Sequence, residues 1–187
     1  MALMKRGANV ALTQEIPGLA AIVVGVRFLA GAERSLLDRL VLATVLCNAE
    51  GHALSAEHFV FFNQLSSPDL SIHQIEQALG DDTEQVEIDF AAVPTAIDRI
   101  TFIAYIDDVP GTRRTFGQLK DCTVRVLNLN GNAELVRSEN LAAGLGPETA
   151  LALGEVYRAG ANWKFRVLGQ GYNDGIKSIA TDYRIPL

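Results

Sequence analysis

The sequence has 187 residues, of which 49% are hydrophobic and 20% are charged, and its net charge is −6 at pH 7. This balance is typical of a globular chain, and a single domain over residues 1–187 is expected. No apolar stretch approaches the roughly 18 residues of a membrane helix, so we expect no membrane insertion. The first residues lack a signal-peptide pattern and the two cysteines form no C-x-x-C pair, which favours a cytoplasmic protein with reduced thiols.

The negative charge is concentrated in one central segment. Residues 40–98 contain no Lys or Arg, while the remaining sequence carries all sixteen basic residues and only twelve acids. A nucleic-acid-binding domain usually carries a basic stripe, so nucleic acid is not an expected partner. A cation or a basic protein surface fits the charge better. The acids of the segment are Glu50, Glu57, Asp69, Glu76, Asp81, Asp82, Glu84, Glu87, Asp89 and Asp98.

Short runs of branched and aromatic residues, separated by turn signals, follow one another along the chain. Such spacing predicts a mainly β protein, specifically a two-sheet β-sandwich. The run at residues 85–90 alternates apolar and polar side chains, as a strand with one buried face does. Residues 35–42 leave helix and strand open. The expected strands, in chain order, are 21–28, 41–47, 59–62, 85–90, 99–106, 123–127, 135–137, 151–158 and 162–168, the last two as a hairpin.

The C-terminal residues show helical periodicity. Apolar positions recur at i, i+3, i+4 and i+7, which predicts a short amphipathic helix packed on the sandwich. Asn173 or Asp174 is the expected N-cap. The preceding segment 169–175 is rich in glycine, but its spacing misses G-x-G-x-x-G, so we interpret it as a turn between the last strand and the helix. The periodic residues are Ile176, Ile179, Ala180 and Tyr183.

No local catalytic signature is present in the sequence. G-x-S-x-G, a Walker loop and H-E-x-x-H are all missing. A Ser-His-Asp or carboxylate pair assembled from distant positions stays open. The histidines His52, His58 and His73 lie in the acidic segment, but their spacing matches no standard metal site.

Carboxylates are densest in Gly80–Glu84, where Asp81, Asp82 and Glu84 fall within four residues. Ca²⁺ requires six to eight oxygen ligands, so a site here needs a second loop, which Asp69 in the turn at 67–69 would supply. The pattern is not that of an EF-hand. A solvated acidic turn is the alternative interpretation.

Several segments resemble the TerD-like tellurium-resistance and stress-response proteins of bacteria. The matching segments occur in the family's order and cover essentially the whole chain. Residues 5–13 resemble "KGxNVxLT", 61–69 "FYNNLxSPD", 80–86 "GDDEQI", 93–100 "VPxxIDKI", 116–118 "NFGQV", and the hairpin 154–158 with 163–172 "GELYRhxxxWKFxAxGQGY".

The resemblance implies a β-sandwich and a cytoplasmic, non-enzymatic protein that binds Ca²⁺ through acid-rich loops. Two departures concern those loops. Leucines 40 and 42 stand where the family's "DLDASAF" strand carries acids, and the family's long acidic loop is shortened to residues 73–82. Loss of two carboxylates removes coordination that a hard cation needs, so any residual calcium site is expected to be weak. The metal ligands predicted to remain are Asp69, Asp81, Asp82 and Glu84, with Asp81 and Asp82 monodentate and Glu84 bidentate.

Three hypotheses follow from the sequence. The first is a non-enzymatic stress-response or tellurium-resistance binding protein with a weak Ca²⁺ site and an unidentified protein partner, such as another stress-response protein. The second is a metal-free interaction scaffold whose acidic face docks a basic partner. The third is a hydrolase with a site assembled from distant residues.

Overall fold

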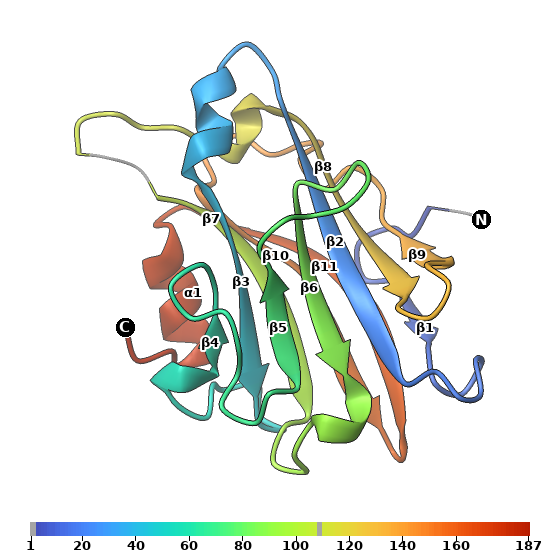
Figure 1. Ribbon diagram of the computed structural model, residues 1–187. Coiled ribbons are helices and arrows are strands. Elements are labelled where there is room, and N and C mark those ends of the chain that lie inside the picture. Colours follow the sequence, from blue (N-terminus) through green and yellow to red (C-terminus); the bar gives the residue numbers. More distant parts are fainter. Residues whose placement is uncertain (1–2, 108–109) are drawn as a thin grey trace.

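Two antiparallel sheets pack face to face in the computed structural model, which describes residues 3–107 and 110–187 (Figure 1). This arrangement confirms the predicted β-sandwich. In spatial order the six-stranded sheet consists of β1 (Asn9–Ala11), β11 (Asn162–Tyr172), β10 (Ala150–Ala159), β7 (Arg99–Ile106), β3 (Leu40–Cys47) and β4 (Phe59–Val60). The five-stranded sheet consists of β5 (Ile72–Ile75), β6 (Glu84–Asp89), β2 (Ala21–Ala30), β8 (Leu119–Asn128) and β9 (Glu134–Arg137).

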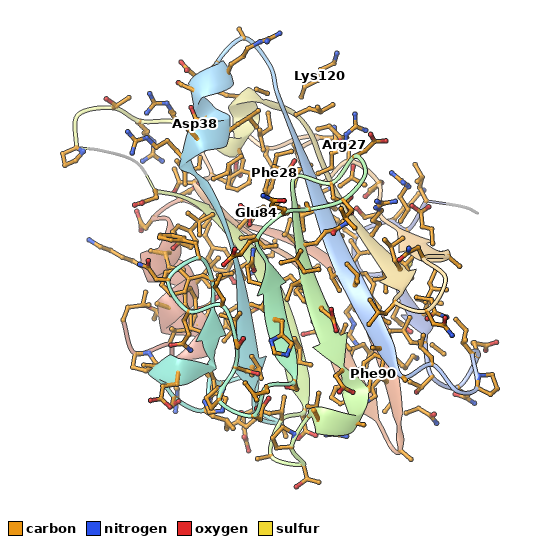
Figure 2. The ribbon with its side chains drawn as sticks, in the orientation of Figure 1. Arg27, Phe28, Asp38, Glu84, Phe90 and Lys120 are labelled. Atoms are coloured by element: carbon orange, nitrogen blue, oxygen red, sulfur yellow. The ribbon has the colours of Figure 1, made fainter. Side chains whose placement is uncertain are left out.

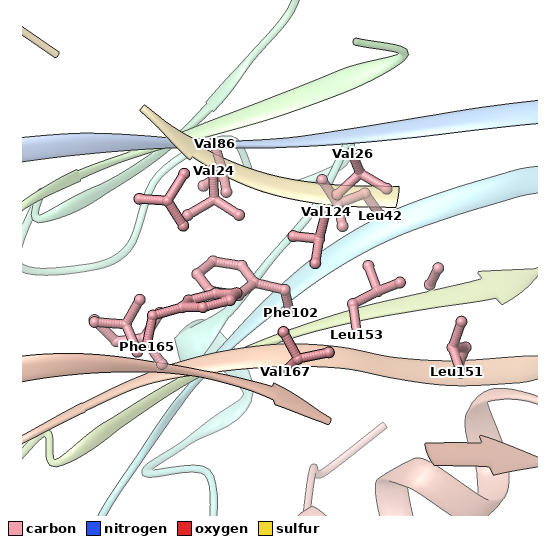
Figure 3. Close-up of a cluster of buried hydrophobic side chains, with 14 of the residues drawn as sticks. Val24, Val26, Leu42, Val86, Phe102, Val124, Leu151, Leu153, Phe165 and Val167 are labelled. Carbon is pink, nitrogen blue, oxygen red and sulfur yellow. The ribbon is translucent and has the colours of Figure 1, made fainter. Parts of the chain in front are cut away.

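The core lies between the two sheets and follows from the two-residue period of a strand. In β6, Val86 and Ile88 point inward and are fully buried, while the alternate polar residues Gln85, Glu87 and Asp89 point outward. Figure 3 shows valines of the five-stranded sheet facing Phe102, Phe165 and other side chains of the opposite sheet. The interdigitated apolar side chains hold the layers together through the hydrophobic effect.

Strand β3 is buried on both of its faces, which explains its continuous apolar sequence. Leu42 belongs to the core between the sheets, while Val45 belongs to a second cluster on the outer face of the six-stranded sheet. Helix α1 (Ile176–Tyr183) covers that second cluster and buries Ile179 there. The C-terminal helix is therefore confirmed.

The predicted cap of the helix is wrong. Gly175 occupies the N-cap position with a φ of 61°, and no side chain caps the helix. Its N–H instead donates to the Thr149 hydroxyl at 2.8 Å. The glycine-rich turn is also shorter than predicted, because β11 continues to Tyr172.

Other differences lie at short or ambiguous segments. Strands β1 and β5, of three and four residues, were not predicted. The aromatic strand predicted at 59–62 covers only Phe59–Val60. The ambiguous segment 35–42 contains both elements, a 3-10 helix at Arg34–Arg39 followed by β3. The other 3-10 helices are Ala56–His58, Phe90–Ala92 and Phe116–Gln118.

The segment 61–71 passes from one sheet to the other at one side of the sandwich. It connects β4, the edge of the six-stranded sheet, to β5, the edge of the five-stranded sheet. Of the predicted ligands, Asp69 lies on this connection, Asp81 and Asp82 lie on the loop between β5 and β6, and Glu84 is the first residue of β6. No helix in the described part of the chain is long and apolar enough to cross a membrane.

Candidate functional site

Asp82 is held inside the protein by a bidentate ion pair with Arg125 of β8. The Nε and Nη2 atoms of Arg125 donate to the two oxygens of Asp82 at 2.8 and 2.9 Å. The side-chain amide of Gln85 donates to the same carboxylate at 2.7 Å. Only 3% of the Asp82 side chain is exposed. Charge-assisted bidentate pairs are among the strongest hydrogen bonds in proteins, so this carboxylate is committed to a structural contact.

Gly25 of β2 provides the space that Asp82 occupies. Gln85, Gly25 and Arg125 lie side by side on three neighbouring strands. A Cβ atom added to Gly25 would overlap the Asp82 carboxylate. The absence of a side chain at this one position therefore allows the acidic loop to fold down onto the outer face of the five-stranded sheet.

The ion pair continues into a small charge network on β9. Arg125 also contacts Glu134 at 3.4 Å, and Glu134 is bonded to Arg137 in turn. Hydrogen bonding to Asp82 raises the pKa of Arg125, and hydrogen bonding from Arg137 lowers the pKa of Glu134. The network fixes the Gly80–Glu84 loop to two further strands.

Asp69 lies at the opposite end of the β5–β6 hairpin from this loop. The Ser71 carbonyl accepts from the backbone N–H of Asp89, the last residue of β6, whereas Glu84 is the first. A strand of six residues spans roughly 20 Å. Asp69 therefore cannot supply a second ligand loop to a cation at Gly80–Glu84.

The Asp69 carboxylate instead organises its own turn. One oxygen accepts from the Ser67 hydroxyl and the Ser71 N–H, both at 2.8 Å, and from the Ser71 hydroxyl. Burial acts to raise the pKa of Asp69, but these hydrogen bonds outweigh it and hold the pKa below its ordinary value. The second oxygen is buried without a partner. One free carboxylate oxygen falls far short of the ligand set that calcium needs.

Glu84 points inward at the open end of the sandwich, and Asp81 is exposed to solvent. Figure 2 shows Glu84 and Phe90 at opposite ends of β6. Burial raises the pKa of Glu84 to about 6, and hydrogen bonds from the Leu42 backbone and the Gln74 side chain oppose the rise. The Gln74 amide donates at 3.1 Å.

A cleft of about 380 Å³ opens beside Glu84. Leu40 and Leu42 form one wall, and Phe62, Leu65 and Gln74 contribute from the connection between the sheets and from β5. We call this space the Glu84 cleft. Sequence reasoning missed Gln74 as a site residue because a lone glutamine in a short strand carries no local signal.

The residues as placed do not fit a calcium ion. Asp82 is paired with Arg125, Asp69 is at the far end of the hairpin, and Leu42 is a buried core residue. Residues 3–107 and 110–187 contain no group of three or more His, Cys, Asp or Glu side chains that could hold one metal ion. The calcium site stays a prediction.

Two serine–histidine contacts bear on the hydrolase hypothesis. The Ser55 hydroxyl lies 2.7 Å from Nδ1 of His58, and the Ser66 hydroxyl lies 2.9 Å from Nδ1 of His73. Ser55 also caps the 3-10 helix that ends at His58. Ser66 and His73 face each other across a β-bridge. Both contacts are explained by local structure, and neither pair lines the Glu84 cleft.

The sequence matches a known family model, since the TerD domain covers residues 1–183. The chain belongs to the TerD family. It is 37% identical to general stress protein 16U of Bacillus subtilis, covering 96% of this chain and 95% of that protein. It is 32% identical to the tellurium resistance protein TerD of Serratia marcescens, covering 97% of this chain and 96% of that protein.

A solved structure gives the same fold. The crystal structure of a TerD homologue from Streptomyces coelicolor superposes with a TM-score of 0.66 over 87% of this chain and 96% of that one. At 19% sequence identity this likeness concerns the fold alone.

The first prediction concerns the space above Gly25. Gly25→Ala should destabilise the protein by about 2 to 4 kcal/mol, because the new methyl group separates Asp82 from Arg125 and leaves the buried Asp82 carboxylate without its ion-pair partner. In an Asp82→Ala background the same Gly25→Ala change should be nearly neutral. Urea unfolding of the four proteins measures the coupling. Equal effects of Gly25→Ala in both backgrounds would contradict the contact.

The second prediction concerns pH. Because the folded pKa of Glu84 is raised to about 6 from 4.5, its ionisation costs stability above pH 6, and this cost disappears below pH 4.5. Glu84→Gln should therefore stabilise the protein by about 1 to 2 kcal/mol at pH 8 and have little effect at pH 4. Thermal melts across this range measure the difference.

Glu87→Gln is the matched control, since Glu87 is on the same strand and points to the opposite face. A gain for Glu84→Gln that is the same at pH 4 and pH 8 would show that the charge of Glu84 is not its cause.

Proposed function

We propose that the protein is a non-enzymatic, cytoplasmic stress-response protein of the tellurium-resistance type, which acts by binding. The observation that carries this proposal is the near-complete match to proteins named for general stress and tellurium resistance, over 95% or more of their length. Relatives that align from end to end and retain the fold often share a role, although fold alone does not fix function. Buried, unpaired Cys47 and Cys122 agree with a reducing compartment.

Catalysis is not part of this proposed role. A serine nucleophile needs a base that is itself oriented by a third group, together with a site for the substrate. The two serine–histidine contacts described above are instead accounted for by a helix cap and a β-bridge. Calcium is also outside the proposed role, because the carboxylates are engaged elsewhere or lie far apart.

Resistance to tellurite tests the proposal. A bacterium whose tellurium-resistance genes are intact except for its own TerD gene should regain several-fold higher tolerance to tellurite when it expresses this chain. Growth inhibition over a tellurite series measures the effect, with empty vector and Gly25→Ala as controls. Unchanged tolerance, with the soluble chain present at the level of the lost protein, would contradict the proposal.

A second candidate function is an interaction scaffold, which the exposed acids favour. Glu76 and Asp81 both lie on the surface near the β5–β6 loop, and neither forms an ion pair within the described residues. Asp82, by contrast, is withdrawn into its pair with Arg125. A basic partner would therefore meet Glu76 and Asp81 rather than the whole acidic loop.

Partner capture tests this second function. Any protein that co-purifies at low salt should be lost on raising the ionic strength, because exposed charges are screened beyond about 10 Å at 0.1 M salt. Glu76→Gln with Asp81→Asn should abolish capture, whereas Glu15→Gln, an exposed acid outside the central segment, should not. Capture that survives the double variant would exclude this acidic surface.

A further inference from the structure

The Glu84 cleft combines apolar walls with a polar end that has acceptors to spare. Its volume of about 380 Å³ is within the range of small-molecule sites. Leu65 and Phe62 supply apolar surface, and Phe62 is 55% exposed. Such a surface favours a ligand with a hydrocarbon portion.

The polar end has two hydrogen-bond acceptors, of which Glu84 lines the cleft and Oε1 of Gln74 is enclosed by protein until the Gln74 side chain turns. Glu84 accepts from the Gln74 Nε2 atom at 3.1 Å. The Oε1 atom of the same Gln74 is buried and has no partner. Exchanging the amide oxygen and nitrogen would place two acceptors together, so the hydrogen bond to Glu84 fixes this orientation. A buried acceptor without a donor carries a desolvation cost that a donor group would remove.

The charge of the lining points to a positively charged donor. The residues that line the cleft include two acids, Glu76 and Glu84, and no basic side chain. Glu84 also makes no ion pair within the described residues, and burial of its carboxylate is costly without one. A cation that reaches Glu84 would therefore be attracted and would compensate the buried charge.

The apolar lining of the cleft favours an organic cation over a metal ion. A hard metal ion requires six to eight oxygens, and leucines occupy one side of the cleft. A primary ammonium group has three N–H donors, which matches an ionised carboxylate and one amide oxygen, and its alkyl chain can lie along the apolar wall.

We propose that the Glu84 cleft binds a primary alkylammonium ion, whose N–H groups donate to the Glu84 carboxylate and, once the Gln74 side chain has turned, to Oε1 of Gln74, while its alkyl chain packs against Leu65 and Phe62. This binding site goes beyond the proposed stress-response role and does not depend on it. Failure of this chain to restore tellurite tolerance would not bear on binding in the cleft. Failure of hexylammonium to bind would likewise not bear on tellurite tolerance.

Titration with n-hexylammonium chloride, followed by NMR, tests the site. The side-chain NH₂ signals of Gln74 and the methyl signals of Leu65 should shift saturably, with a Kd on the order of 1 mM. Hexan-1-ol, which has the same chain without the charge, should bind at least about tenfold more weakly, a difference of about 1.4 kcal/mol.

Two variants locate the binding. Glu84→Gln should weaken hexylammonium binding at least about tenfold, and Glu87→Gln on the outer face of β6 should leave it unchanged. Gln74→Leu, which removes the unpaired acceptor, should also weaken binding and provides a second variant if Glu84→Gln alters the fold. Equal binding of hexanol and hexylammonium, retention of affinity in Glu84→Gln, or no saturable shift in the wild-type protein would each overturn the proposal.

Discussion

The arrangement of the acidic loop depends on the ion pair between Asp82 and Arg125, which lies over Gly25. Three neighbouring strands contribute to it, since Gln85 of β6 and Arg125 of β8 flank the glycine of β2. The pair withdraws the Asp82 side chain from solvent and holds the Gly80–Glu84 loop against the outer face of its sheet. It therefore sets which carboxylates are available, leaving Asp81 at the surface and Glu84 at the open end of the core.

The uneven charge of the sequence is partly cancelled in the fold. The central segment has no basic residue of its own, but Asp82 pairs with Arg125 and Asp98 lies 3.8 Å from Arg158. Both arginines come from the C-terminal half of the chain. The number of acids in the central segment therefore overstates how acidic the surface is, because the fold brings arginines from distant segments next to some of these acids. Glu76 and Asp81 are acids that stay exposed.

The sequence predicted the fold better than the site. Alternation located β6, because burial of one face imposes a two-residue period. The continuous apolar run at Arg99–Ile106 gave the bounds of β7, which is buried on both faces. The site depended on long-range contacts that no local pattern contains. Asp82 meets a partner 43 residues away, and the turn at Asp69 lies a full strand length from Glu84. Density of carboxylates along the chain was therefore a poor guide to their proximity in space.

The central claim is that Asp69 and Asp82 are engaged by the protein itself, and that the remaining carboxylates do not converge on one hard cation. Calorimetric titration of Ca²⁺ into the metal-free protein, together with its melting temperature, tests this claim most directly. We predict no saturable heat and no rise in melting temperature at millimolar Ca²⁺, since a ligand that binds only the folded state must stabilise it. Saturable heat with a raised melting temperature, both lost in Asp81→Asn, would contradict the account.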